Sequence, residues 1–197
     1  IESVDENTTN EEFHELFGML KGISGNLNES LSHLMDVLSI RRSAAIETQT
    51  MRLQGIFEKT VAGLHGQITK ANASVKGNFE KAPDLNYSRI YLESIFHNLI
   101  SNALKYRKPD VAPDIELWSE ISGKHLLLHV RDNGIGIDLN KHGHKMFGMN
   151  QRFTNHPDSK GIGLFMTKTQ IESMKGKISV ESEPGVGTTF TVSFAID

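Results

Sequence analysis

The N-terminal part of the chain carries apolar residues at every third or fourth position. The first run extends from Phe13 to Leu38 and includes Leu16, Leu20 and Leu27. This spacing places the apolar side chains on one face of a helix, with a period close to the heptad of helical bundles. The pattern predicts one long amphipathic helix, which packs either in a bundle or on its own domain. A second helical stretch is expected from about residue 46 to about residue 65.

The rest of the chain alternates between helical and strand-like patterns. A helix is expected over residues 91–106 and should end before Pro109, because helical backbone is disfavoured in the residue that precedes a proline. Residues 138–160 have no periodicity and are expected to form a long loop, and another helix is expected over residues 163–174. Short turns between neighbouring strands favour an antiparallel or mixed sheet over a Rossmann sheet. Strands are expected over residues 74–80, 114–119, 124–130, 177–182 and 188–195, with turns at 82–88 and at 122–123.

Composition and charge narrow the class of protein. The 197 residues are 38% hydrophobic and 23% charged, which is typical of a folded protein of one or two domains. The net charge of -3 argues against a nucleic-acid binder, and the absence of cysteine excludes disulfides, a thiol nucleophile and Cys-based zinc sites. No apolar run is long enough for a membrane span, and the acidic start does not resemble a signal peptide. We therefore expect a soluble chain.

Three Gly-x-Gly units suggest a nucleotide site. They occupy residues 134–136, 161–163 and 185–187, and none extends into a Rossmann or P-loop motif. The second unit opens a predicted helix, so free backbone N–H groups and the positive end of the helix dipole would face an anion there. Three unrelated turns would also explain the pattern, because glycine pairs serve ordinary turns.

A polar face on the predicted helix over residues 91–106 adds a second indication. Asn98, Asn102 and Lys105 follow one another at steps of four and three, which places them on one side. An amide oxygen can ligate Mg²⁺ while phosphates supply the negative charge, and a lysine can bind phosphate as a point charge. Capped or solvated amides are the alternative explanation.

These features together resemble the ATP-binding domain of sensor histidine kinases. The resemblance rests on the segments HNLISNALKYRKP (97–109), RDNGIGID (131–138), FGMNQRF (147–153), SKGIGL (159–164) and GVGTTF (185–190), which occur in the family's order over about residues 70–197. That family shares its fold with the gyrase, MutL and heat-shock chaperone ATPases. The resemblance implies an α+β protein with a two-layer α/β sandwich, a mixed, largely antiparallel sheet and an ATP lid, preceded by the long amphipathic helix. It also implies a division into residues 1–66, a partial dimerisation helix with a linker helix, and residues 67–197, the ATP-binding domain.

The resemblance also assigns roles to individual residues. Asn102 corresponds to the magnesium ligand and Asp132 to the aspartate that accepts a hydrogen bond from the adenine amino group. Phe147 and Phe153 would anchor the lid, and Lys105 and Arg152 would act electrostatically on the phosphates. The implied nucleotide-binding positions are Asn98, Asn102, Lys105, Tyr106, Asp132, Gly134, Gly136, Gly161, Gly163, Leu164 and Thr188.

Two positions depart from the motifs of related ATPases. Ser159 stands where the family commonly has the first glycine of the lid motif, which affects the expected flexibility of the lid. Asn98 stands where ATP-hydrolysing relatives carry a glutamate that activates water. Because an amide is a poor base, Asn98 favours phosphoryl transfer to a protein side chain over hydrolysis.

The histidine that would accept the phosphate is not evident in the sequence. His14, in HELFGML, matches the acceptor motif only in part and lies unusually close to Asn98. Residues 25–40 align better with the second helix of the family's dimerisation hairpin, which would place the acceptor outside this chain. His14 is kept as the alternative acceptor.

The sequence therefore predicts the ATP-binding catalytic portion of a two-component sensor histidine kinase, an ATP-dependent phosphotransferase that uses ATP and Mg²⁺. Its expected partners are an acceptor-histidine helix and the receiver domain of a response regulator, with a homodimeric parent protein and no nucleic acid. The expected location is cytoplasmic, with a parent protein that could be anchored in a membrane. The alternatives are a gyrase-like or chaperone-like ATPase and a nucleotide-binding regulatory module without transfer activity.

Overall fold

A computed structural model of the protein describes residues 46–143, 146–148 and 162–196. The described residues all belong to one compact unit, which spans residues 44–197. The predicted amphipathic helix and His14 lie outside the described residues, and the domain division at residue 66 stays a prediction. None of the helices in the described part of the chain combines the length and apolar character needed to cross a membrane.

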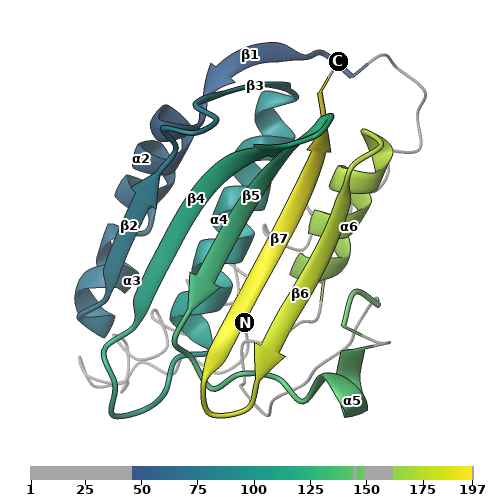
Figure 1. The fold of residues 1–197 in the computed structure, drawn as a ribbon. Helices are drawn as coiled ribbons and strands as arrows, with labels where there is room; N and C mark the ends of the chain where they lie inside the picture. The colour runs from purple at the N-terminus through teal and green to yellow at the C-terminus, as the bar shows by residue number, and fades with distance from the viewer. Residues whose placement is uncertain (1–45, 144–145, 149–161, 197) are drawn as a thin grey trace, which may run out of the picture. The chain divides into compact units, whose positions relative to one another are not determined.

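A five-stranded mixed sheet forms one layer of this unit (Figure 1). Its strand order is β2 (Ser74–Asn78), β4 (Asp114–Ser122), β5 (His125–Asp132), β7 (Gly187–Ala195) and β6 (Lys177–Glu183). β2 pairs parallel with β4, and the other three pairs are antiparallel. The predicted α+β fold class and mixed, largely antiparallel sheet are confirmed.

Three helices cover one face of the sheet and form the second layer (Figure 1). They are α2 (Leu53–Gly63), α4 (Arg89–Lys105) and α6 (Gly163–Ser173), and the short α3 (His65–Ala71) follows α2. Apolar residues at helical spacing on α4, including Leu92, Phe96 and Leu99, are almost fully buried. Complete burial of such a side chain contributes about 1.5–3 kcal/mol, so this face of α4 explains why the helix docks on the sheet.

The strands alternate in the way that a sheet covered on one face requires. In β5, Leu126, Leu128 and Val130 are buried, and the intervening residues are half-buried or exposed. The same period of two recurs in β4 and β7. The β4–β5 hairpin turns at Gly123, whose φ of 60° is readily adopted by glycine.

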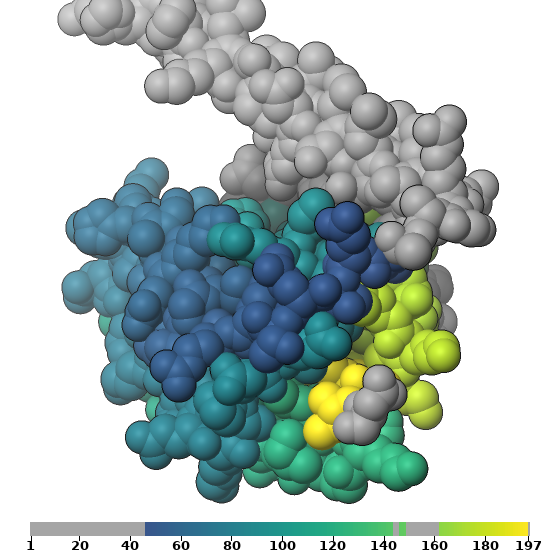
Figure 2. All heavy atoms as spheres, turned by 90° about the horizontal axis from the view of Figure 1, so that it is seen from above, coloured from purple at the N-terminus to yellow at the C-terminus, as the bar shows by residue number. Residues whose placement is uncertain are grey.

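Three local predictions were wrong. Residues 139–142, within the predicted long loop, form the short helix α5 (Leu139–His142). Residues 49–52 form the strand β1 (Gln49–Arg52) and not the start of a helix, and residues 84–87 form β3 (Asp84–Tyr87) and not a turn. The two strands pair antiparallel as a separate ribbon, at the end of the unit where β7 also ends (Figures 1 and 2). This pairing joins segments more than 30 residues apart, and local patterns do not encode such a contact.

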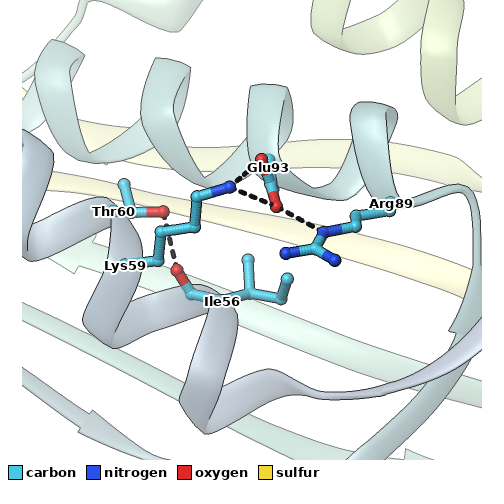
Figure 3. A network of polar contacts seen from close by, with 5 residues as sticks. All are labelled: Ile56, Lys59, Thr60, Arg89 and Glu93. Carbon is cyan, nitrogen blue, oxygen red and sulfur yellow. Dashed lines mark hydrogen bonds and ion pairs between the residues drawn. The ribbon is translucent and has the colours of Figure 1, made fainter.

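A polar network ties α2 to α4 (Figure 3). Lys59 Nζ lies 2.8 and 2.7 Å from the two carboxylate oxygens of Glu93, and Arg89 Nε donates to Glu93 Oε1 at 2.8 Å. These hydrogen bonds from Arg89 and Lys59 lower the pKa of Glu93 below its usual value. Glu93 therefore stays ionised and links two helices that pack side by side.

We expect Glu93→Gln to lower the free energy of unfolding by about 1 kcal/mol at neutral pH, the upper range for ion pairs near a surface. Because the pKa of Glu93 is lowered on folding, its contribution is present above the pKa of an unfolded Glu and is lost as the pH falls through the folded value. Urea unfolding at several pH values measures this difference, with Glu80→Gln at an exposed site as the control. Equal stability of parent and Glu93→Gln at neutral pH would contradict the expectation.

Candidate nucleotide-binding site

Four residues form a row across one end of the sheet, opposite the end that carries the β1–β3 ribbon. Ile115, Asp132, Thr188 and Ser182 are successive register partners on β4, β5, β7 and β6. The alternation along each strand places this row on the face that the helices cover. In Figure 1 this is the end at which the β5 arrow points and β7 begins.

Asp132 is the ionisable group of the row. Its Oδ1 accepts a hydrogen bond from the Gly134 N–H at 2.8 Å, and the Thr188 N–H donates to the same carboxylate. Burial raises the pKa of Asp132 above the usual value, and this effect outweighs the two backbone hydrogen bonds and the charge of Lys108, which lower it. The backbone thus holds a partly buried acceptor at a fixed place, an arrangement suited to a ligand that presents an N–H donor.

Backbone contacts fix the segment that follows Asp132. Ile135 N–H donates to the carbonyl of Tyr106 at 3.0 Å, and Gly185 N–H donates to the carbonyl of Ile135 at 2.8 Å. The end of α4, the loop after β5 and the β6–β7 turn are therefore joined. Gly134 packs directly against the backbone of Tyr106. A Cβ at position 134 would lie only 2.6 Å from the Tyr106 carbonyl oxygen.

Gly136 is required for two reasons. Its φ of +69° lies in the left-handed region, and a Cβ at this position would overlap the carbonyl of Glu183. The Gly-x-Gly unit at 134–136 thus permits close approach of backbone to backbone. This is a structural basis for a motif that the sequence identified only by its glycines.

Ser182 was missed by the sequence reasoning. Its hydroxyl lies 2.8 Å from the Ile137 nitrogen, 2.8 Å from the Gly187 carbonyl oxygen and 2.9 Å from Thr188 Oγ1. The sequence feature that could have identified Ser182 is the alternation of residues along β6, which places Ser182 on the same face as Ile178 and Val180.

The polar face of α4 lies beside the start of α6. Asn98 Oδ1 is 3.4 Å from the place that a Cβ would occupy at Gly163, the first residue of α6. The residue at the N-cap of α6, Ile162, has no polar side chain to cap the helix, and the first N–H groups of any helix lack an intrahelical partner. Asn98, Asn102, Lys105 and Leu164 are all half-buried, and Lys105 Nζ lies 5.5 Å from the ring centroid of Tyr106.

Some predicted site residues cannot be placed. Gly161, Arg152, Ser159 and Phe153 lie outside the described residues. Phe147 is described and half-buried, and Lys168 Nζ lies 5.7 Å from its ring centroid. Among the described residues, no cluster of three or more acidic or histidine side chains could hold a metal ion. A divalent cation at this site would need ligands from an amide such as Asn102 and from a bound phosphate group.

Comparison with known proteins identifies the family. Residues 88–197 match the model of the histidine kinase-, DNA gyrase B- and HSP90-like ATPases, which is more than half of the chain. The chain belongs to this family. The matched range contains every predicted nucleotide-binding residue, from Asn98 to Thr188. The ATP-binding catalytic domain that the sequence predicted is thereby confirmed.

Similar curated proteins of this ATPase family include sensor proteins. The phytochrome-like protein Cph1 of Synechocystis is 32% identical over 160 residues, which cover 78% of this chain and 21% of Cph1. Sensor protein RprX of Bacteroides fragilis is 27% identical over 192 residues, which cover 90% of this chain and 37% of RprX. The chain thus spans between about a fifth and two fifths of the length of these two relatives.

Solved structures support the fold of this ATPase domain. The histidine kinase AdeS of Acinetobacter baumannii has a TM-score of 0.74 at 19% identity, covering 96% of this chain and 86% of AdeS. Full-length ShkA, in complex with AMPPNP, has a TM-score of 0.73 at 21% identity, covering 97% of this chain and 40% of ShkA.

Proposed function

We propose that this chain is the catalytic portion of a two-component sensor histidine kinase, which transfers the γ-phosphate of ATP to a histidine. Within the ATPase family, the residue that favours a kinase over an ATP-hydrolysing enzyme is Asn98. It is the residue of α4 whose side chain lies beside the N-terminus of α6, where the phosphates would bind. An amide there cannot act as a general base towards water, so the site favours transfer to a protein nucleophile over hydrolysis.

The row at the end of the sheet would bind the adenine base. Asp132 would accept a hydrogen bond from the adenine amino group, with Thr188 beside it in register. Gly134 and Gly136 would keep the loop after β5 close to the base, and Tyr106 would contact the nucleotide at the end of α4. These roles are supported by the convergence of α4, β5 and β7 on one end of the sheet.

The α4 face and the start of α6 would bind the phosphates. The first N–H groups of α6 have no carbonyl partner within the helix and favour an anion, and Gly161, Gly163 and Leu164 would surround it. Lys105 would offset phosphate charge, and Arg152 would approach from the lid. Asn102 would hold Mg²⁺ through its amide oxygen, and the ion would supply positive charge that offsets the negative charge of the phosphates.

Transfer requires an acceptor histidine aligned with the γ-phosphorus. In the proposed step an imidazole nitrogen forms a bond to phosphorus while the bond to the bridging oxygen of ADP breaks. This chain would contribute positioning and electrostatic stabilisation, through the α6 N-terminus and Lys105. No residue of the described part would remove a proton, because a neutral imidazole nitrogen attacks with its lone pair.

The acceptor histidine and the further partners are also proposed. The acceptor would lie on a helix supplied from outside this chain, with His14 as the alternative, and the phosphate would pass to the receiver domain of a response regulator. The parent protein would be a homodimer acting on the cytoplasmic side, anchored in a membrane or not. The similarity to a sensor protein, RprX of Bacteroides fragilis, supports this setting.

A transfer assay tests the proposed function. The chain would be mixed with a separate acceptor-helix fragment, Mg²⁺ and ATP labelled at the γ-phosphate. Acid-labile, base-stable label on the fragment is the expected result. Steady release of phosphate over many turnovers without a fragment would support an ATPase instead, and ATP binding without transfer would support a regulatory module. A parallel reaction without the fragment detects label on His14.

We expect Asn102→Ala to weaken binding of ATP in the presence of Mg²⁺ on the order of tenfold, because such sites bind the ion through one or two protein ligands and the phosphates. Binding measured with EDTA should differ much less between the variant and the parent. Calorimetric titration under both conditions gives the comparison, and Asn86→Ala, at an exposed site on β3, is the matched control. An equal loss with and without Mg²⁺ would contradict a role in metal binding.

A further inference from the structure

The hydroxyl of Ser182 contacts three polar groups at the end of the sheet. One is a backbone N–H, that of Ile137 at 2.8 Å, and one is a carbonyl oxygen, that of Gly187 at 2.8 Å. The third is the hydroxyl of Thr188, at 2.9 Å between the two oxygens. Thr188 and Gly187 are both buried, and Ser182 is half-buried. These contacts therefore lie where an unmade hydrogen bond is costly.

The number of available hydrogens fixes the direction of each bond. A hydroxyl has one hydrogen and two lone pairs. The carbonyl of Gly187 can only accept, so the single hydrogen of Ser182 is donated to it. One lone pair of Ser182 accepts from the Ile137 N–H. The contact with Thr188 is then satisfied only when Thr188 donates its hydrogen to Ser182.

The hydrogen bond that Thr188 donates to Ser182 determines whether Thr188 can act as a donor or an acceptor towards a ligand. With its hydrogen committed to Ser182, Thr188 Oγ1 keeps only acceptor capacity. Its register partner Asp132 is likewise only an acceptor when ionised. The end of the sheet therefore presents two acceptors next to each other.

We propose that Ser182 is a positioning residue that fixes Thr188 as an acceptor, so that the pocket selects purines with an amino group at position 6 over purines with a carbonyl there. This inference rests on the proposed function, since it requires a nucleotide base beside Asp132. An amino group carries two hydrogens for these acceptors. A carbonyl oxygen would face two acceptors without a hydrogen between them, which disfavours its binding.

The test compares ATP with inosine triphosphate, which has a carbonyl in place of the 6-amino group. Both affinities would be measured by calorimetry with Mg²⁺ on the 197-residue chain. In Ser182→Ala the Thr188 hydroxyl becomes free to donate towards a carbonyl. The ratio of ATP affinity to inosine triphosphate affinity should then fall about fivefold, the effect of roughly one hydrogen bond. Ser182→Thr, which restores the hydroxyl, should keep the ratio of the parent.

A double-mutant cycle separates this role from a purely structural one. Thr188→Val removes the hydroxyl and nearly keeps the shape, so it should weaken ATP binding and leave inosine triphosphate binding unchanged or stronger. Adding Ser182→Ala to Thr188→Val should not change the ratio further, because Ser182 acts through the Thr188 hydroxyl. The Thr188→Val result decides the question if Ser182→Ala does not fold.

Two outcomes would overturn the inference. One is an unchanged nucleotide ratio in a folded Ser182→Ala variant that still binds ATP. The other is a Thr188→Val variant that loses affinity equally for both nucleotides, as expected if Thr188 also donates. Absence of ATP binding by the parent chain would instead overturn the proposed function itself, so the two failures are distinguishable.

Discussion

Replacing Asp132 by Asn should lower the affinity for ATP by roughly 100-fold, because a hydrogen bond to a charged acceptor contributes about 1.5–3 kcal/mol. The fold should be at least as stable as that of the parent. Burial raises the pKa of Asp132, which means that the ionised carboxylate is less favourable in the folded protein than in water. Asn removes this cost and keeps one oxygen, which can accept from the N–H groups of Gly134 and Thr188.

The raised pKa also predicts how binding and stability depend on pH. The folded protein takes up the Asp132 proton at a higher pH than the unfolded chain does, so the cost of the charge is present at neutral pH and disappears as the pH falls through the folded value. ATP affinity should decline in acid from a higher pH than an exposed aspartate would give. The difference in ATP affinity between the parent and Asp132→Asn should shrink over the same range.

Titration of ATP into both proteins over a series of pH values, together with thermal unfolding, checks these expectations. Comparison with Asp132→Asn removes the contribution of the ATP phosphates, which titrate in both cases. Asp110→Asn, at an exposed site, is the control for loss of one negative charge. An Asp132→Asn variant that binds ATP as well as the parent, or that is strongly destabilised, would contradict the account.

Replacing Gly136 by Ala should destabilise the domain by about 3 kcal/mol or more. Left-handed backbone costs a residue with a Cβ about 1–2 kcal/mol, and overpacking against fixed atoms adds about 1–3 kcal/mol. Both apply here, because φ is +69° and the new Cβ would overlap the Glu183 carbonyl. That carbonyl is backbone at the β6–β7 turn, which cannot move away as a flexible side chain could.

Gly123 is the matched control. Its φ of +60° is nearly the same, but no atom lies within 4 Å of the place a Cβ would occupy. Gly123→Ala should therefore cost only about 1–2 kcal/mol, the backbone contribution alone. Urea unfolding of the two variants isolates the clash as the difference between them. Equal destabilisation would show that the contact between the loop after β5 and the β6–β7 turn is not as tight as described.

Patterns of residues close together in the chain were sufficient to predict many of the helices and strands. The apolar spacing of Ile95, Leu99 and Leu104 predicted α4, and the alternation on each side of Gly123 predicted the β4–β5 hairpin. Each of these elements is specified by residues close together in the chain, which is why periodicity and turn residues identify them.

Contacts between distant segments were not predictable in the same way. β1 pairs with β3 across more than 30 residues, and the alternation of Leu85 and Tyr87 in β3 was obscured by neighbouring turn-forming residues. Ser182 was not predicted as a site residue, because a serine in a strand usually faces solvent. Its role follows from the register that brings β6 and β7 together beside Ile137. The motifs thus indicated Asp132 and Thr188, while the network that orients them required the structure.

The most direct test of the account is calorimetric titration of ATP into the 197-residue chain, first with Mg²⁺ and then with EDTA. Saturable binding of one ATP per chain is expected, weakened when EDTA removes the ion and weakened strongly by Asp132→Asn. Absence of ATP binding by the folded parent chain, or binding that Asp132→Asn leaves unchanged, would contradict it.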